Sequence, residues 1–187
     1  DFSQGSELGD LSLPDPDTRR PVDFARRVEL LDRLGSTNPT ASLAEWRDGT
    51  VKLFVTRRLA SYRREQRELF DNGAYLPLEV AGSRRDHVIA FARQHGDAWS
   101  VTIVPRLVAT LARAAGLAGE APPVGEVAWA DTRVLLPEDA PARWRDVLTS
   151  ATREASGCLP LASLLASFPL AVLDGTAEAA TPPDRAR

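Results

Sequence analysis

The chain is predicted to have an α+β fold, with a helical first part and a β-rich second part. Apolar residues recur at helical spacing between residues 21 and 72, which gives the expected helices one apolar face. After residue 73 the pattern changes to the alternation that is typical of half-buried strands. The Asn72-Gly73 pair, which is suited to ending a helix, places the division between the two parts.

The first expected helix runs from about Pro21 to Gly35. Proline suits the first helical position, and glycine is common just after the last one. A capping-box pattern from Ser42 to Glu45 predicts a second, short helix. The apolar face of the first helix consists of Phe24, Val28 and Leu31.

The longest helical pattern begins at Asp48 or Thr50 and continues to Asn72-Gly73. Its apolar residues fall on one side of a helix, and arginines and glutamates occupy the other side. This pattern predicts one amphipathic helix, whose apolar stripe consists of Val51, Phe54, Val55, Leu59, Tyr62 and Leu69.

Strands dominate the prediction after Gly73. Residues 87–93 and 98–104 alternate well, and Gln94-His95-Gly96-Asp97 between them is typical of a hairpin loop. Residues 75–80 form a further expected strand. The remaining expected elements are helices at 106–115 and 161–166, strands at 127–136 and 168–173, and a flexible tail at 176–187.

The composition is that of an ordinary soluble domain, with 43% hydrophobic and 26% charged residues. The net charge of −3 argues against a dedicated nucleic-acid binder, and no apolar run is long enough to cross a membrane. Cys158 is the single cysteine, which favours a cytoplasmic protein. Because the chain has no methionine, we expect it to be a processed chain or a fragment.

The most informative stretch is Asp10 to Phe24, which places four acids and two adjacent arginines around three prolines. Proline fixes its own φ and restricts the preceding residue, so this segment has few accessible shapes. A stiff loop with clustered charge is suited to presenting carboxylates and guanidinium groups to a polar ligand.

Together with Phe2-Ser-Gln-Gly-Ser-Glu-Leu8, this stretch resembles the end of the catalytic barrel in the maltooligosyl trehalose synthase family. The resemblance continues in order through most of residues 1–173, so it does not depend on a single short motif. The further matching segments are Asp48-Gly49-Thr50-Val51-Lys52, Gly73-Ala-Tyr-Leu-Pro-Leu78, His87 to Arg93, and Trp129 to Thr132 with Leu136-Pro137.

The resemblance implies membership of the α-amylase superfamily. Residues 1–72 would then be the last loop and helices of a (β/α)8 barrel, and residues 73–175 a C-terminal antiparallel β-sandwich domain. Family enzymes convert the reducing-end α-1,4 bond of a maltooligosaccharide into an α,α-1,1 bond by retaining intramolecular transglycosylation. Retention requires two carboxyl groups about 5–5.5 Å apart. In the family these groups precede the segment matched here, so we expect no catalytic residue in this chain, which would be inactive alone.

What the resemblance assigns to this chain is substrate contact beside the scissile bond, with no cofactor and no metal. The expected partners are the maltooligosaccharide and the rest of the catalytic barrel, with no nucleic acid and no membrane. Thr18 stands where the family has asparagine, Pro14 replaces a valine and Gly9 replaces a bulky residue. The predicted substrate-binding residues are Asp15, Arg19, Arg20, Asp17, Gln4, Glu7 and Lys52.

Other interpretations stay open at this point. Asp15 and Arg19 can form an ion pair that holds the loop, and Glu7 or Lys52 can support the fold without touching substrate. Trp99 and Trp129 are better explained by core packing than by sugar stacking. The chain as a whole could also be a non-catalytic carbohydrate-binding or interaction module, or part of another hydrolase of the superfamily.

Overall fold

The computed structural model describes residues 5–9, 21–34, 43, 48–117 and 121–176. The chain divides into two compact units, Asp1–Glu65 and Gln66–Arg187. The predicted substrate residues other than Glu7 and Lys52, the expected helix at 42–45 except Leu43, and the tail beyond Thr176 lie outside the described residues.

Two helices organise the described part of the first unit, α1 (Phe24–Leu34) and α3 (Thr50–Glu65). Helix α1 begins after Asp23, whose carboxylate accepts a hydrogen bond from the backbone N–H of Arg26 at 2.9 Å. The apolar face predicted for α1 is only partly correct. Phe24 and Val28 are 54% and 56% exposed, and the buried residues are Leu30 and Leu34.

The predicted long helix is two helices in the structure. α3 ends at Glu65, and α4 (Arg67–Asn72) follows in the second unit after Gln66, whose backbone angles are not helical (φ −101°, ψ 39°). The predicted end at Asn72 is confirmed, but Gly73 is extended and not left-handed. A glycine is needed there because a Cβ would lie 2.2 Å from the carbonyl oxygen of Leu69.

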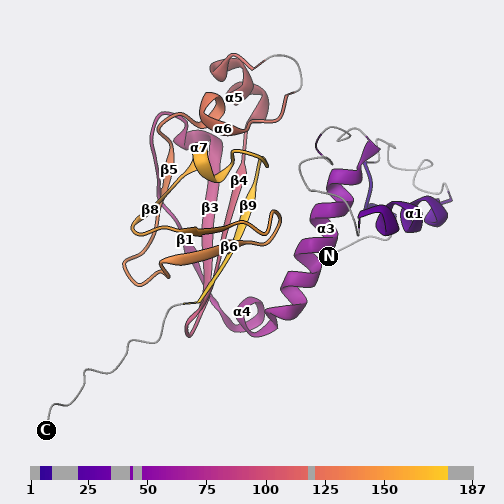
Figure 1. Ribbon diagram of the computed structural model, residues 1–187, viewed down its shortest axis with the longest axis horizontal. Helices are drawn as coiled ribbons and strands as arrows, with labels where there is room; N and C mark the ends of the chain where they lie inside the picture. The colour runs from indigo at the N-terminus through magenta and orange to yellow at the C-terminus, as the bar shows by residue number, and fades with distance from the viewer. Residues whose placement is uncertain (1–4, 10–20, 35–42, 44–47, 118–120, 177–187) are drawn as a thin grey trace, which may run out of the picture. The chain divides into compact units, whose positions relative to one another are not determined.

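A six-stranded antiparallel sheet forms one layer of the second unit, in the order β1-β3-β4-β9-β6-β7 (Figure 1). The predicted hairpin at its centre is confirmed, with a shorter turn at Gly96-Asp97. The strands are β1 (Ala74–Pro77), β3 (Val88–His95), β4 (Ala98–Pro105), β6 (Arg143–Asp146), β7 (Thr152–Glu154) and β9 (Ala171–Thr176).

The second layer of this unit combines a small sheet with short helices. The sheet has the order β2-β5-β8, and the core lies between the layers, with Trp99, Trp129 and Leu159 all at most 1% exposed. The strands of this layer are β2 (Val80–Ala81), β5 (Arg133–Leu135) and β8 (Cys158–Pro160), and the helices are α5 (Val108–Ala115), α6 (Gly125–Trp129) and α7 (Leu161–Leu164), with a 3₁₀ turn η3 at Arg85–His87.

Several predicted strands need correction. The strand expected over 127–136 is helix α6 followed by the short strand β5, because an apolar run of this length does not distinguish a buried helical turn from a strand. The strand expected over 75–80 is divided between the two sheets. The last strand begins at Ala171, and Phe168 lies before it as a buried residue.

The expected helices at 106–115 and 161–166 are confirmed as α5 and α7, with shorter bounds. The mixed α and antiparallel β character is therefore confirmed as well. Strands β6, β7 and β8 were not predicted, because each has at most four residues and carries charged or proline side chains.

Candidate functional site

The candidate site is the segment Gly5–Gly9, which directly precedes the charged, proline-rich stretch. Among the predicted substrate residues, Glu7 and Lys52 are described. Asp15, Arg19, Arg20, Asp17 and Gln4 lie outside the described residues. The structure thus shows how the entry to the charged stretch is held.

Helix α1 holds this segment through Arg27, which lies one turn after the start of the helix. The Arg27 Nε donates to Glu7 Oε2 at 2.9 Å, and its two terminal nitrogens donate to the backbone carbonyls of Gly5 and Asp23. The Arg27 side chain is only 15% exposed. Since one guanidinium satisfies two carbonyls and a carboxylate, it fixes the segment against the first turn of α1.

The carboxylate of Glu7 also turns back onto its own segment. Its Oε1 accepts a hydrogen bond from the Gly5 N–H at 3.2 Å. Hydrogen bonding by its own backbone N–H, by Arg27 and by Gly5 lowers the pKa of Glu7, and desolvation opposes that shift. Glu7 is therefore an ionised carboxylate that already has partners within the chain.

The start of helix α3 holds the other end of the segment. The Lys52 Nζ donates to the backbone carbonyl of Leu8 at 3.2 Å. Gly49 has φ +82°, and a Cβ on it would lie 2.5 Å from the Gly9 nitrogen, so only glycine fits there. Asp48 accepts a hydrogen bond from the Thr50 N–H at 2.8 Å and thereby caps α3.

The motif Asp48-Gly49-Thr50-Val51-Lys52 thus has a local structural use at three of its positions. Its aspartate caps the helix, its glycine permits close approach of the segment, and its lysine bonds the segment. The two helices are also joined to each other, since Arg57 Nη1 donates to the Leu31 carbonyl at 2.9 Å. We name Arg27, Gly49, Lys52 and Arg57 the loop frame.

The chemistry of the loop frame is positioning. Its side chains bond backbone carbonyls and one carboxylate, and none of these contacts supplies a nucleophile and base in reach of each other. Among the residues that the structure describes, no group of three or more His, Cys, Asp or Glu side chains could hold a metal ion. The substrate roles of Glu7 and Lys52 stay predictions, because both side chains have partners within the chain.

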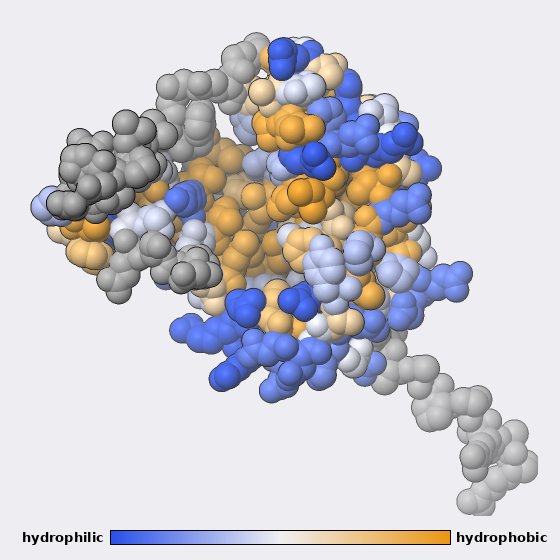
Figure 2. Space-filling model, turned by 180° about the vertical axis from the view of Figure 1, so that it is seen from behind, coloured by the Kyte–Doolittle hydropathy of each residue, from blue (hydrophilic) through white to orange (hydrophobic). Residues whose placement is uncertain are grey.

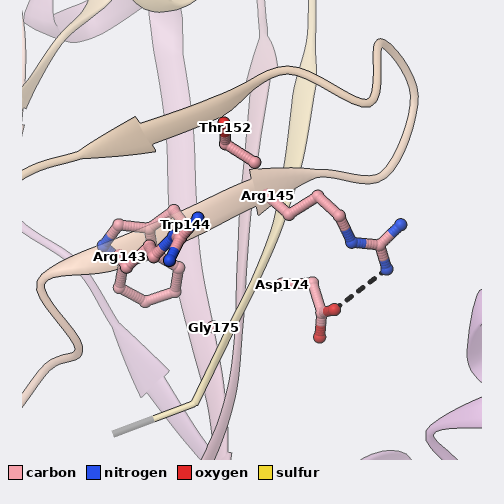
Figure 3. Close-up of a pocket in the computed structure, with 6 residues that line it drawn as sticks. All are labelled: Arg143, Trp144, Arg145, Thr152, Asp174 and Gly175. Carbon is pink, nitrogen blue, oxygen red and sulfur yellow. Dashed lines mark hydrogen bonds and ion pairs between the residues drawn. The ribbon is translucent and has the colours of Figure 1, made fainter. Parts of the chain in front are cut away.

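A second polar site lies on the six-stranded sheet and was not predicted from the sequence. Arg145 and Asp174, on the adjacent strands β6 and β9, form an ion pair of 3.0 Å beside a shallow pocket (Figure 3). The alternation of Arg143, Trp144 and Arg145 was a signal for a strand with one charged face. Arg143, Trp144, Arg145, Thr152, Asp174 and Gly175 line the pocket.

The other residues that the sequence pointed to have structural roles in the core or in turns. Trp99 and Trp129 are confirmed as core residues, and Trp129 Nε1 donates to the Pro123 carbonyl at 2.9 Å. Asp131 accepts two hydrogen bonds from Ser83, which hold the turn after β2 onto the turn before β5. No helix within the described residues is long and apolar enough to cross a membrane.

Comparison with known proteins gives a consistent result. No family model matches the chain. It is 35% identical over 173 residues to proteins from two strains of Mycobacterium tuberculosis that carry the provisional name maltooligosyl trehalose synthase. The match covers 92% of this chain and 18% of those proteins, so the chain spans less than a fifth of the length of these curated relatives.

A solved structure agrees with these relatives. Maltooligosyltrehalose synthase from Arthrobacter ramosus matches with a TM-score of 0.68 and 38% identity, over 92% of this chain and 19% of that one. A Ser-to-Pro variant of the same enzyme matches equally well. The resemblance inferred from the motifs is therefore confirmed.

Proposed function

Since this chain is a homologue of the C-terminal part of maltooligosyl trehalose synthases, we propose that it is part of an enzyme of that kind. The enzyme would convert the reducing-end α-1,4 bond of a maltooligosaccharide into an α,α-1,1 bond. The observation that carries the proposal is the similarity over 92% of the chain, at 35–38% identity, to proteins of that name.

In this proposal the charged stretch contacts the sugar just past the scissile bond. Asp15 and Arg19 are the first candidates for that contact, followed by Arg20, Asp17 and Gln4. A carboxylate accepts hydrogen bonds from sugar hydroxyls, and a guanidinium donates two parallel ones. During isomerisation a released glucose has to turn without escaping to solvent, so such contacts favour the 1,1 product over hydrolysis.

The loop frame supports the proposal by fixing the segment that leads into this stretch. Arg27 and Lys52 hold residues 5–9 from two helices, and Gly49 allows the close approach. Because effective orientation depends on sub-ångström placement, a frame outside the sugar site can still affect product choice. Glu7 and Lys52 would act in this way as positioning residues.

The catalytic carboxylates of a retaining enzyme would lie in the part of the polypeptide outside this chain. The 187-residue chain alone is then expected to leave maltopentaose unchanged. Isomerase activity in the isolated chain would contradict this assignment.

The full-length polypeptide provides the main test. Incubation with maltopentaose should give a non-reducing product of unchanged length, detected by loss of reducing ends without chain shortening. Production of shorter reducing sugars alone would identify a hydrolase of the same superfamily. In the same assay Arg19→Ala should raise hydrolysis relative to isomerisation, and an unchanged ratio would refute a role for Arg19 in holding glucose.

A further inference from the structure

The short helix α6 passes into strand β5 through a tight turn, Trp129–Thr132. The N–H of Thr132 donates to the Trp129 carbonyl at 2.9 Å, and Ala130 has φ 45° and ψ −122°. A hydrogen bond between the first and fourth residues, with these angles at the second, is typical of a type II′ β-turn. The chain therefore turns sharply directly after the buried Trp129.

Alanine is an unfavourable residue at this position of the turn. Type II′ turns favour glycine there, because a Cβ at positive φ crowds the neighbouring backbone. Among the described residues, Leu107 and Ser150 are the other non-glycine residues with positive φ. Leu107, however, has ψ 43° and lies in the left-handed helical region, which side chains can occupy. Ala130 is exposed, so burial of its methyl group does not offset the backbone strain.

A second segment holds this turn in place. The hydroxyl and the backbone N–H of Ser83 both donate to Asp131 Oδ1, at 2.6 and 2.9 Å, and the backbone N–H of Arg84 donates to Thr132 Oγ1 at 3.0 Å. The two bonds from Ser83 lower the pKa of Asp131, so this carboxylate stays ionised at neutral pH. Hydrogen bonds to an ionised acceptor are stronger than neutral ones. We name Ser83, Arg84, Asp131 and Thr132 the turn clamp.

The clamped turn joins segments that lie far apart in the sequence. The segment before Ser83 lies so close that a Cβ on Gly82 would be 2.6 Å from the Thr132 Cα. The Thr132 carbonyl accepts a hydrogen bond from the N–H of Leu161, at the start of α7, at 2.9 Å. The turn is thus held by residues 82–84 on one side and by α7 on the other.

Helix α6 depends on this turn. It has five residues, too few for a helix that is stable by itself. Ala128 and Trp129 are fully buried, and the Trp129 Nε1 donates to the Pro123 carbonyl at 2.9 Å, whereas Val127 is 66% exposed. The surface of the molecule likewise shows hydrophobic areas bordered by hydrophilic ones (Figure 2). Opening of the turn would release Trp129 from the core.

We propose that the turn Trp129–Thr132 is a conformational latch, in which the turn clamp holds a strained backbone closed and keeps α6 on the core. The strain at Ala130 favours an opened turn, and the hydrogen bonds of the clamp oppose it. Loss of the clamp would open the turn and α6 while the six-stranded sheet stays folded, because local opening requires less free energy than global unfolding. The inference does not depend on the substrate of the proposed enzyme.

Hydrogen exchange of the full-length polypeptide, measured by mass spectrometry and corrected for intrinsic exchange rates, tests the strain. Ala130→Gly relieves it, so the peptide that covers residues 126–132 should exchange at least about threefold more slowly than in wild type. Ala109→Gly is the matched control, because Ala109 is exposed on α5 and has no positive φ. Glycine is unfavourable within a helix, so the peptide that covers residues 108–115 should exchange faster in that variant.

Asp131→Ala tests the clamp. Because it removes both hydrogen bonds from Ser83, the peptide that covers residues 126–132 should exchange at least about tenfold faster than in wild type. Addition of Ala130→Gly to this variant should restore part of the protection, since the turn then needs less support. The peptide that covers β3, residues 88–95, should exchange at the wild-type rate in every variant.

Three results would overturn the proposal. Equal or faster exchange of residues 126–132 in Ala130→Gly would show that the turn is not strained. Unchanged exchange in Asp131→Ala would show that the clamp does not hold the turn. Equal acceleration of residues 88–95 in Asp131→Ala would show that the whole unit unfolds and that the turn does not open separately. Hydrogen exchange needs no substrate, so the proposed function can fail while this inference stands.

Discussion

The two units of the chain are built in different ways. In Asp1–Glu65 the side chains of Arg27 and Lys52 bond backbone carbonyls of a loop, and the buried apolar residues include Leu30 and Leu53. In Gln66–Arg187 two layers enclose a continuous apolar core that contains Trp99, Trp129 and Trp144. The comparison separates two tasks: the first unit holds the segment that leads into the proposed site, and the second provides a two-layered body with its own core.

The largest effect is expected in the core of the second unit. Ile103 is fully buried within the sheet, so Ile103→Ala should lower the free energy of unfolding by about 2–5 kcal/mol. Leu30→Ala on α1 is the matched change in the first unit, where we expect the low end of the same range because fewer layers surround it. Chemical denaturation followed by circular dichroism measures both. A larger loss for Leu30→Ala would reverse the comparison.

Glycine substitutions distinguish close packing from backbone conformation. Gly49 and Gly157 both have positive φ, +82° and +75°, but only Gly49 has neighbours that a Cβ would overlap. A left-handed backbone costs an alanine roughly 1–2 kcal/mol at either position. Gly49→Ala should therefore lower the melting temperature more than Gly157→Ala. Equal losses would show that the loop does not lie against Gly49.

Two carboxylates should give the units opposite responses to pH. Burial raises the pKa of Asp146, although Leu148 and Thr149 donate to it, so its contribution becomes less favourable as pH rises through the ordinary aspartate value of about 4. Asp146→Asn keeps an acceptor oxygen. The stability of this variant relative to wild type should therefore increase as pH rises from about 3 to 7.

Glu7 has a lowered pKa and behaves in the opposite sense. Its ionised form stabilises the folded state above the ordinary glutamate value, and that stability is lost as pH falls through the lower folded value. Glu7→Gln should therefore lose stability relative to wild type as pH rises from about 3 to 7. Parallel pH dependence in the Glu7→Gln and Asp146→Asn variants, each measured against wild type, would contradict these assignments.

Much of the fold followed from the sequence where patterns were long. The alternation over residues 88–104 predicted the central hairpin, and the glycine after Asn72 marked the end of a helix. Short elements were missed because three or four residues carry little periodicity. Helix α6 was taken for a strand because its apolar run is equally compatible with both, and only its place in the core distinguishes them.

The sequence motifs pointed to the candidate site, but they could not predict which residues bond each other there. The sequence pointed to Glu7 and Lys52 but could not show that their partners would be Arg27 and the Leu8 carbonyl. Arg27 was missed because nothing in its local pattern sets it apart from the other arginines. Its role depends on a contact with a residue twenty positions away along the chain.

The central claim is that the loop frame positions the charged stretch that is proposed to hold the sugar, and Lys52→Met tests it most directly. Methionine keeps an unbranched, flexible chain but removes the ammonium that bonds the Leu8 carbonyl. Lys52→Arg keeps a donor, and Arg67→Met removes an exposed cation on α4 as a control. All three are compared with wild type in the full-length polypeptide with maltopentaose.

The measurement is the ratio of isomerised product to released glucose, compared among variants whose melting temperatures match that of wild type. Lys52→Met is predicted to lower that ratio at least about threefold, with Lys52→Arg restoring part of it and Arg67→Met leaving it unchanged. A ratio for Lys52→Met equal to that of wild type would contradict the claim that this frame sets the placement of the stretch proposed to hold glucose.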